Sequence, residues 1–230
     1  MKFGSINCIK EEITMNVEVV SSFFSPDIPS LIKKESNDLY IEFLEITDEL
    51  NEALLEFKLP PAVKCVYNPS IYARYTFEMY VRKYCNTKKK IMFFGMNPGP
   101  WGMSQTGVPF GEISSVRDWL GIDGPVNRPP QEIRERPVDG FNCKRTEVSG
   151  KRFWGLFKTL CGTPDKFFET SFVYNYINQQ WMKSNGCNLT PGDFKILYLS
   201  HPSPRSVNNN NWEEKALGEL KRHDLIKYFN

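Results

Sequence analysis

The sequence lacks several features that would place it in a class at once. Its 230 residues contain no apolar run that approaches the length of a membrane span. The N-terminal residues Met1–Cys8 contain no secretory apolar stretch. The formal net charge is only +2, so whole-chain charge does not indicate strong DNA binding, although a local basic face could. We therefore expect no membrane partner.

Metal-binding patterns are also missing. The chain has two histidines, and its six cysteines form no Cys-x-x-Cys pair. This spacing argues against zinc and iron–sulfur sites. Without an export signal, it predicts free thiols in a reducing compartment. The cysteines in question are Cys8, Cys65, Cys85, Cys143, Cys161 and Cys187.

With 40% apolar and 14% aromatic residues, the chain has enough material for one packed domain. We expect a weakly ordered tail over 1–37 and a folded domain over 38–230. Apolar spacing predicts helices at 38–57, about 71–85, 114–120, 149–161 and within 211–230, and strands at 91–95, 172–175 and 195–199. Strands that alternate with helices predict an α/β fold with a parallel sheet covered on both faces.

The loop after the first strand is the most informative stretch. Gly or Pro occupies seven of the fifteen positions from Asn97 to Gly111, and the aromatic Phe110 closes the loop. In open parallel sheets, ligands bind beyond the carboxyl ends of the strands. Asn97, Asn175 and His201 each follow a predicted strand, so we expect these side chains to meet in one pocket.

Two further segments stand out. Lys88–Lys90 precedes the first strand; it is either a solvated strand entry or a localisation or DNA-contact signal, and the first interpretation is favoured. Residues 121–143 are rich in Pro, Gly and Arg and predict a long irregular excursion, which inside a compact domain tends to be functional or mobile.

At these residues the chain resembles the single-strand-selective monofunctional uracil-DNA glycosylases, a branch of the uracil-DNA glycosylase superfamily. The resemblance covers roughly residues 60–220, and the block Gly95–Glu112 followed by His-Pro-Ser-Pro-Arg at 201–205 is its most specific part. The other matching segments are 67–69, 116–121, 124–126, 147–150, 152–155, 172–173, Asn175 and 188–191.

The resemblance implies a three-layer α/β/α fold with a short parallel sheet. It implies an enzyme that extrudes uracil from DNA and hydrolyses the bond to deoxyribose, leaving an abasic site in base-excision repair. No metal or cofactor is implied. The expected partner is uracil-containing DNA, single- or double-stranded, and the expected protein is a nuclear monomer.

The resemblance also implies roles for individual residues. Asn97 would hold the attacking water, and His201 would donate a hydrogen bond to the uracil oxygen where negative charge builds. Asn175 would read the base edge, with an acceptor for N3–H and a donor for O4. Phe110 would stack on the ring.

The remaining implied roles concern shape and DNA contact. Met96 and Gly99 would supply backbone and shape, and the small Gly99 would admit 5-hydroxymethyluracil. The DNA-contacting residues would be Asn185, Gly186, Asn188 and Thr190 in one loop and Pro202, Ser203, Pro204 and Arg205 in another, with Arg205 wedged into the base stack.

Each role has a plain structural alternative. Asn97 and Asn175 could simply form turns, and His201 could be satisfied by a strand-end carbonyl. Phe110 could be one more core ring among 17 phenylalanines, and Arg205 could form an ordinary ion pair.

The chain also departs from the family pattern. The family places a helix, a strand and a second helix between the segments that here are Phe194 and Lys195. Neighbouring strands lie about 4.8 Å apart, so losing a middle strand would open the sheet or shift its last strand. A misplacement of about 1 Å can cost roughly 100-fold in rate. This predicts a sheet short of one strand, in a truncated isoform or an incomplete gene model.

Three functions compete at this point. The first is an active uracil-DNA glycosylase. The second is a catalytically impaired, DNA-binding relative. The third is a hydrolase of small nucleotides, which would have no use for a wedge at Pro202–Arg205. Abasic-site formation in a uracil-containing oligonucleotide separates them.

Overall fold

Two parallel strands lie between layers of helices. The computed structural model describes residues 38–56, 58–61, 63–175, 195, 197–206 and 209–229. Strand β1 (Ile91–Gly95) pairs in parallel with β2 (Ser171–Asn175), residue for residue along their full length. These strands confirm two of the three strand predictions, and they bring Gly95 and Asn175 side by side. The predicted tail at 1–37 lies outside the described residues.

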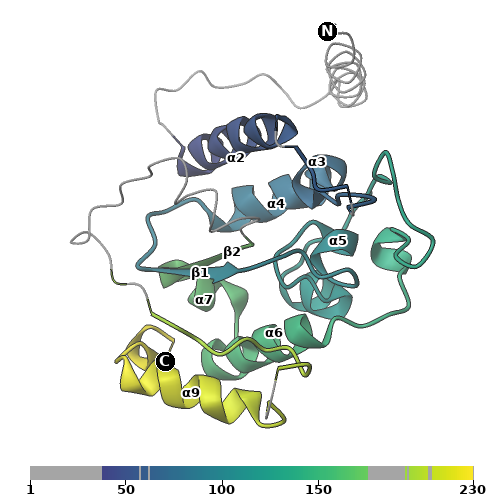
Figure 1. Cartoon of the computed structure of the whole chain (residues 1–230). Helices are drawn as coiled ribbons and strands as arrows, with labels where there is room; N and C mark the ends of the chain where they lie inside the picture. The colour runs from purple at the N-terminus through teal and green to yellow at the C-terminus, as the bar shows by residue number, and fades with distance from the viewer. Residues whose placement is uncertain are drawn as a thin grey trace, which may run out of the picture. The chain divides into compact units, whose positions relative to one another are not determined.

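One face of the sheet packs on α2 (Leu39–Leu55) and α4 (Arg74–Tyr84) (Figure 1). The Tyr80 ring of α4 stacks on Phe172 of β2 with 5.0 Å between ring centroids, and its hydroxyl donates to the Val173 carbonyl over 2.8 Å. The Phe43 ring of α2 meets Phe172 edge-on at 5.3 Å. Aromatic pairs of this kind contribute beyond the apolar area that they bury.

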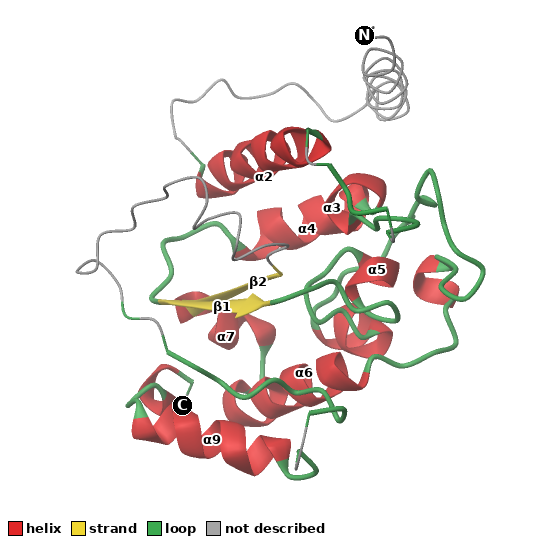
Figure 2. Cartoon of the chain, in the orientation of Figure 1, coloured by secondary structure: helices red, strands yellow, loops and turns green. Residues whose placement is uncertain are grey.

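The other face packs on α6 (Val148–Cys161) and α7 (Pro164–Thr170). Phe93 of β1 lies 5.6 Å from Phe153, 5.2 Å from Phe157 and 6.0 Å from Phe167, measured between ring centroids. Helices thus cover both faces of the sheet, as Figure 2 shows. The predicted three-layer α/β arrangement is confirmed.

Helix α2 buries polar as well as apolar positions. Its buried residues are Leu44, Thr47 and Asn51, whereas Ile46 is 57% exposed. The two buried polar residues have hydrogen-bond partners, one within the helix and one outside it. The Thr47 hydroxyl donates to the Phe43 carbonyl, and the Asn51 oxygen accepts from the Asn68 amide at 2.8 Å.

The helix predicted at 71–85 is divided. Ala73, with φ −100° and ψ 32°, leaves helical geometry between α3 (Pro69–Tyr72) and α4. Helix α7 was not predicted, although it begins with a familiar signal: Pro164 in the first turn and a Thr163 side chain that accepts from the Lys166 N–H. The shorter elements are α5 (Met103–Thr106), a π-helical turn η1 (Ser115–Trp119), and the 3-10 turns η2 (Gly140–Asn142) and η3 (Ile226–Tyr228).

The strand predicted at 195–199 is wrong. Residues 195 and 197–200 belong to no strand. Side chains of α9 (Trp212–Arg222) bind this backbone instead: the Glu219 carboxylate accepts from the Ser200 N–H at 2.9 Å, and the Trp212 indole donates to the Ser200 carbonyl at 2.6 Å. Within the described residues β1 therefore has a strand partner on one side only, and its Phe94 is 63% exposed.

The remaining structural expectations concern thiols and membranes. The four described cysteines, Cys65, Cys85, Cys143 and Cys161, are free, as predicted. Cys8 and Cys187 lie outside the described residues. None of the helices that the structure describes is long and apolar enough to cross a membrane.

Candidate functional site

The carboxyl ends of β1 and β2 meet at Gly95 and Asn175. Asn175 is 5% exposed, and its Oδ1 lies so close to Gly95 that a methyl group built on that glycine would sit 1.8 Å from it. The same added carbon would lie 3.2 Å from the Phe110 ring. A residue without a side chain at position 95 therefore lets the strand end, the amide and the ring converge.

Within the part of the chain that the structure describes, the side-chain amide of Asn175 makes a hydrogen bond through its nitrogen but not through its oxygen. Its Nδ2 donates to the Met103 sulfur at 3.3 Å, whereas its buried Oδ1 has no hydrogen-bond partner among the described residues. A thioether is a weak acceptor, so the amide retains donor capacity. Leaving a buried acceptor unpaired costs about 1–3 kcal/mol. A ligand N–H that donates to the unpaired Oδ1 would therefore bind favourably.

Phe110 occupies a strained backbone position. Its φ is 51°, a left-handed value that is unusual for a bulky residue and costs about 1–3 kcal/mol. Its carbonyl accepts from the Trp154 indole at 3.0 Å and from the Glu112 N–H at 2.7 Å. One face of its ring stacks on Phe153, with 4.5 Å between centroids and 9° between planes. Buried neighbours thus fix the Phe110 ring beside Asn175.

The corner after Phe110 is held by a carboxylate. Glu112 accepts from the Ser115 N–H at 2.8 Å and from the hydroxyls of Ser114 and Ser115. Burial raises the pKa of Glu112, but these hydrogen bonds outweigh burial, and the pKa lies below its ordinary value. The charged form is therefore favoured at the start of the η1 turn.

His201 reaches the same place from the C-terminal part of the chain. Its ring centroid lies 6.3 Å from that of Phe110. Its Nδ1 accepts from the Ser203 N–H at 3.1 Å, so the proton of the neutral imidazole sits on Nε2. Burial lowers the pKa of His201 below 6.5, and the Glu147 carboxylate opposes this shift. At neutral pH the ring is thus an uncharged donor through Nε2–H.

The turn that carries His201 is held by residues that sequence reasoning missed. The buried Asn209 donates through Nδ2 to the carbonyls of both His201 and Ser203 at 2.8 Å. Arg152 of α6 donates to the Asn209 carbonyl at 2.9 Å and to the Pro202 carbonyl at 3.3 Å. The position of Asn209 within an Asn-rich tract gave no signal of this role. Arg152 belongs to the segment 152–155, which matches the family, but the resemblance implied no role for it.

Glu147 is the third residue to which the sequence assigned no role. Its carboxylate occupies the space beside two glycines of the loop: a carbon built on Gly99 would lie 2.3 Å from Glu147 Oε2, and one built on Gly102 would lie 2.7 Å from Glu147 Cγ. Because Glu147 also acts electrostatically on His201, it links the glycine-rich loop to the imidazole. The space beside Gly99 is therefore filled by a carboxylate, whereas the resemblance implied room there for 5-hydroxymethyluracil.

A cavity of about 10 Å³ adjoins this arrangement, lined by Leu50, Asn51, Asn68, Pro69, Ser70, Pro98, Met103, Tyr174 and Asn175. That volume suits about one water molecule. It is too small for a pyrimidine ring, so it is an accessory space behind Asn175. Among the residues that the structure describes, no three His, Cys, Asp or Glu side chains are grouped as metal ligands.

The structure brings four of the predicted residues together: Gly99, Phe110, Asn175 and His201. Met96 and Asn97 follow β1 directly but are exposed, and Met96 is 65% exposed. Pro202 is buried, and Ser203 caps the next turn by accepting from the Arg205 N–H at 3.2 Å. Pro204 and Arg205 are exposed.

The ion-pair alternative for Arg205 finds no support, because its side chain forms no ion pair with any residue in the described ranges. Four predicted DNA-contacting residues, Asn185, Gly186, Asn188 and Thr190, lie outside those ranges.

Comparison with known proteins identifies similar sequences among curated proteins. No family model matches the chain. The chain is 51% identical over 151 residues to the single-strand selective monofunctional uracil DNA glycosylase of Mus musculus, 52% identical to that of Rattus norvegicus and 50% identical to that of Bos taurus. The match covers 66% of this chain and 54–56% of the relatives, so the chain spans about half the length of the curated relatives it matches. At this identity, the matched region is similar to the single-strand selective monofunctional uracil-DNA glycosylases of these mammals.

Proposed function

We propose that this chain is a monofunctional DNA glycosylase that removes uracil from DNA. The observation that carries the proposal is the buried Oδ1 of Asn175, which has no donor in the described structure. Uracil in its ordinary form offers an N3–H at the edge that such an acceptor would read, whereas cytosine offers an acceptor at that position. The wrong base would leave two acceptors facing each other, a mismatch that supports strong discrimination.

His201 supplies the chemistry that fits this base. Hydrolysis breaks the bond between C1′ of deoxyribose and N1 of uracil, and the bonding electron pair leaves with the base. Negative charge then builds on the uracil oxygens. A neutral Nε2–H donor, set by the Ser203 N–H on Nδ1, stabilises that charge without transferring its proton. One such donor is typically worth roughly 2.7–4 kcal/mol in the transition state.

The other residues orient the reactants. Phe110 presents one ring face to the base because Phe153 covers the other, and stacking is worth about 1–3 kcal/mol per base. Asn97 would hold the water whose oxygen attacks C1′. A strong base is unnecessary once the sugar carries positive charge, since orientation alone supplies much of the rate.

Several finer features belong to the same proposal. The substrate range would include 5-hydroxymethyluracil, admitted beside Gly99 if the Glu147 carboxylate yields. Pro202, Ser203, Pro204 and Arg205 would contact DNA as the base leaves the stack, with Asn185, Gly186, Asn188 and Thr190 in a second contact loop. The chain would act as a monomer in the nucleus, without a metal or cofactor, on single- and double-stranded DNA.

The test is release of uracil from a single-stranded oligonucleotide, followed as alkali-labile abasic sites. His201→Gln should lower the rate by about 100- to 1,000-fold. His223→Gln, which changes the second histidine of the chain, is the matched control and should retain the wild-type rate. Equal rates for wild type and His201→Gln would contradict the assigned role. The same assay with 5-hydroxymethyluracil, and with Gly99→Tyr, tests the substrate range.

A specific observation also supports a second candidate, a DNA-binding relative with impaired catalysis. Residues 195 and 197–200 form no strand, so His201 is not held by a sheet. Asn97 is exposed, and its side chain makes no hydrogen bond to any described residue. Oligonucleotide binding without abasic-site formation would select this candidate. A rate that rises when the missing helix–strand–helix segment is restored would support it further.

A further inference from the structure

The guanidinium of an exposed arginine sits over a tryptophan ring beside the candidate site. The Arg145 guanidinium carbon sits 4.1 Å from the centroid of the Trp101 ring. A guanidinium held over an aromatic ring by a cation–π contact still has N–H donors that can bind a phosphate. The indole therefore orients a cation that would otherwise sample many rotamers.

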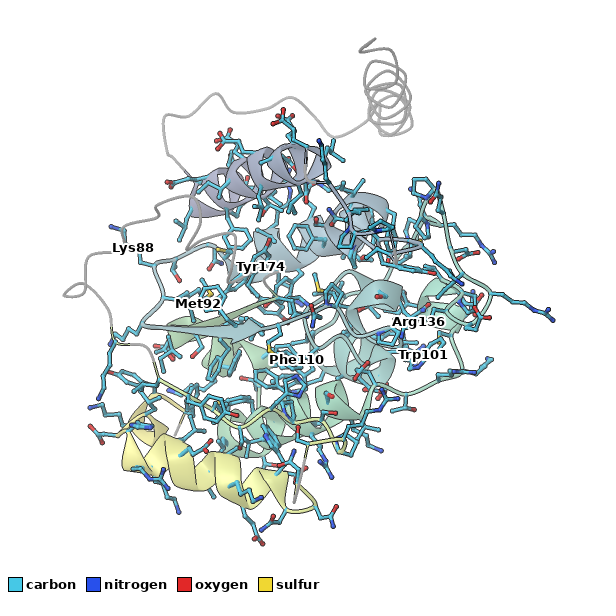
Figure 3. All side chains as sticks on the ribbon, viewed as in Figure 1. Lys88, Met92, Trp101, Phe110, Arg136 and Tyr174 are labelled. Atoms are coloured by element: carbon cyan, nitrogen blue, oxygen red, sulfur yellow. The ribbon has the colours of Figure 1, made fainter. Side chains whose placement is uncertain are left out.

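A buried glutamine brings a second arginine to the same place. Gln105 donates through Nε2 to the carbonyls of Pro100 and Pro137 at 2.9 Å each. These carbonyls directly precede Trp101 and follow Arg136 in the sequence. The side-chain oxygen of Gln105 also accepts from the Asp139 N–H at 2.9 Å. One side chain thus joins two loops, and Figure 3 shows Trp101 and Arg136 near one another.

We call the set Trp101, Arg136, Lys144 and Arg145 the basic rim. Its three cations are exposed, and none of them forms an ion pair within the described residues. The nearby Arg128 differs, since it pairs with Glu132 at 2.8 Å and lies 3.8 Å from Asp139. The basic rim therefore carries uncompensated positive charge, although the net charge of the whole chain is only +2.

The basic rim adjoins the site. Glu147, two residues after Arg145, packs against Gly99 and Gly102 and acts on His201. Trp101 lies between those two glycines. A DNA strand whose extruded base lies at His201 would therefore carry its neighbouring phosphates past the basic rim.

We propose that the basic rim binds phosphates of the DNA strand that flanks the extruded nucleotide, with Arg145 held in its binding orientation by Trp101. This inference extends the proposed function to the path of the strand. The partner is DNA because regularly spaced phosphates match several unpaired cations along one surface, and their neutralisation releases counterions. The nearby Arg128 does not belong to this set, because its charge is already paired with Glu132.

The experiment measures the affinity for a single-stranded oligonucleotide with thymine in place of uracil as a function of salt. For single strands, each phosphate contact contributes about 0.7 to the slope of log affinity against log salt. Arg145→Gln should lower the slope by about 0.7, and the combination of Arg136→Gln, Lys144→Gln and Arg145→Gln by about 2. Over a fourfold rise in salt, wild type should then lose roughly 20-fold more affinity than the triple variant.

Two matched variants make the result specific. Arg128→Gln removes a cation that is already neutralised and should leave the slope unchanged. Trp101→Leu should weaken binding partly, and Trp101→Phe should restore it, since a phenyl ring can still carry the guanidinium. An unchanged slope in the triple variant, with unaltered thermal unfolding, would overturn the proposal. So would an Arg128→Gln effect as large as that of Arg145→Gln.

The readout needs no uracil, so it is independent of catalysis. If wild type binds through the basic rim yet releases no uracil, the proposed function fails and the basic rim stands. If uracil is released while the triple variant binds like wild type, the basic rim fails and the proposed function stands.

Discussion

The two halves of the candidate site are held in place by different kinds of interaction. Phe110 and Asn175 are fixed by close packing and by the ladder of β1 and β2: glycines allow contacts that a single methyl group would forbid. His201 is fixed by the side chains of Asn209, Arg152 and Trp212, each of which donates a hydrogen bond to a backbone carbonyl in or near the turn that carries His201. The first half is packed like a protein core. The second half is a loop held by hydrogen bonds from side chains to its backbone.

This difference implies different responses to change. Packed interiors tolerate added volume poorly, because neighbouring backbone cannot move cheaply. A loop held by such hydrogen bonds can lose one of them and still remain folded, but His201 is then positioned less precisely. We therefore expect damage to the first half to lower stability and damage to the second half to lower activity.

The largest effect should come from Gly150→Ala in α6. Its added carbon would lie 2.1 Å from the Phe110 carbonyl oxygen, which is backbone and cannot swing aside. Overpacking of this kind costs about 1–3 kcal/mol, and Phe110 is already in a left-handed conformation. Urea denaturation should show a lower midpoint, and uracil release should fall with it.

The same helix supplies the control. Nothing lies within 4 Å of a carbon built on Gly155, which is exposed on α6. Gly155→Ala should therefore stabilise the protein by about 0.5–1 kcal/mol, the usual gain in a helix interior. If both substitutions shift the midpoint in the same direction, packing against Phe110 is not what distinguishes position 150.

An intermediate effect should come from Asn209→Ala in the second half. The change removes two donors, to the His201 and Ser203 carbonyls, each worth about 0.5–1.5 kcal/mol net. A shift of His201 by about 1 Å would cost roughly 100-fold in rate. We expect the rate of uracil release to fall far more than the stability.

Asn211→Ala is the control for that change, because within the described residues the side chain of exposed Asn211 hydrogen-bonds only to the Glu214 carboxylate, at 3.3 Å. It should leave both the rate and the midpoint near wild type. A large loss of stability in Asn209→Ala, with an unchanged rate for the remaining folded protein, would mean that Asn209 supports the fold and not the position of His201.

The same contrast explains what the sequence could predict. The first half follows from local signals: a short apolar run at 91–95, a second at 172–175, and polar or glycine residues directly after or at their ends. Parallel strand ends meet at one edge of a sheet, so the meeting of Gly95 and Asn175 could be foreseen. The left-handed backbone of Phe110 could not, because it depends on the Trp154 indole 44 residues away.

The second half was predicted for the wrong reason. The apolar run at 195–199 indicates a strand, but a strand also needs a neighbour, which no local pattern specifies. Here α9 binds the backbone at Ser200 instead. His201 reached the site all the same, because its position depends on Asn209 and Arg152. These hydrogen bonds join residues up to 57 positions apart, so the amino-acid composition does not predict them.

The smallest effect concerns the Glu147 carboxylate, whose charge acts between the two halves. The Glu147 carboxylate raises the pKa of His201, against the larger lowering that burial causes. Glu147→Gln keeps the shape and removes the charge, so the pKa of His201 should fall further below 6.5. NMR titration can follow this shift, with His223 as the second histidine signal.

The sign of the pH effect on stability follows from the direction of that shift. A histidine with a lowered native pKa binds fewer protons in the folded state than in the unfolded state between its native pKa and about pH 6.5. The free energy of unfolding is therefore at its full value above about pH 6.5 and decreases as the pH falls toward the native pKa. Glu147→Gln should widen this window, and His201→Gln should abolish it. If Glu147→Gln instead left the pKa of His201 unchanged, the carboxylate would not be acting on the imidazole, and the two halves would be electrostatically independent.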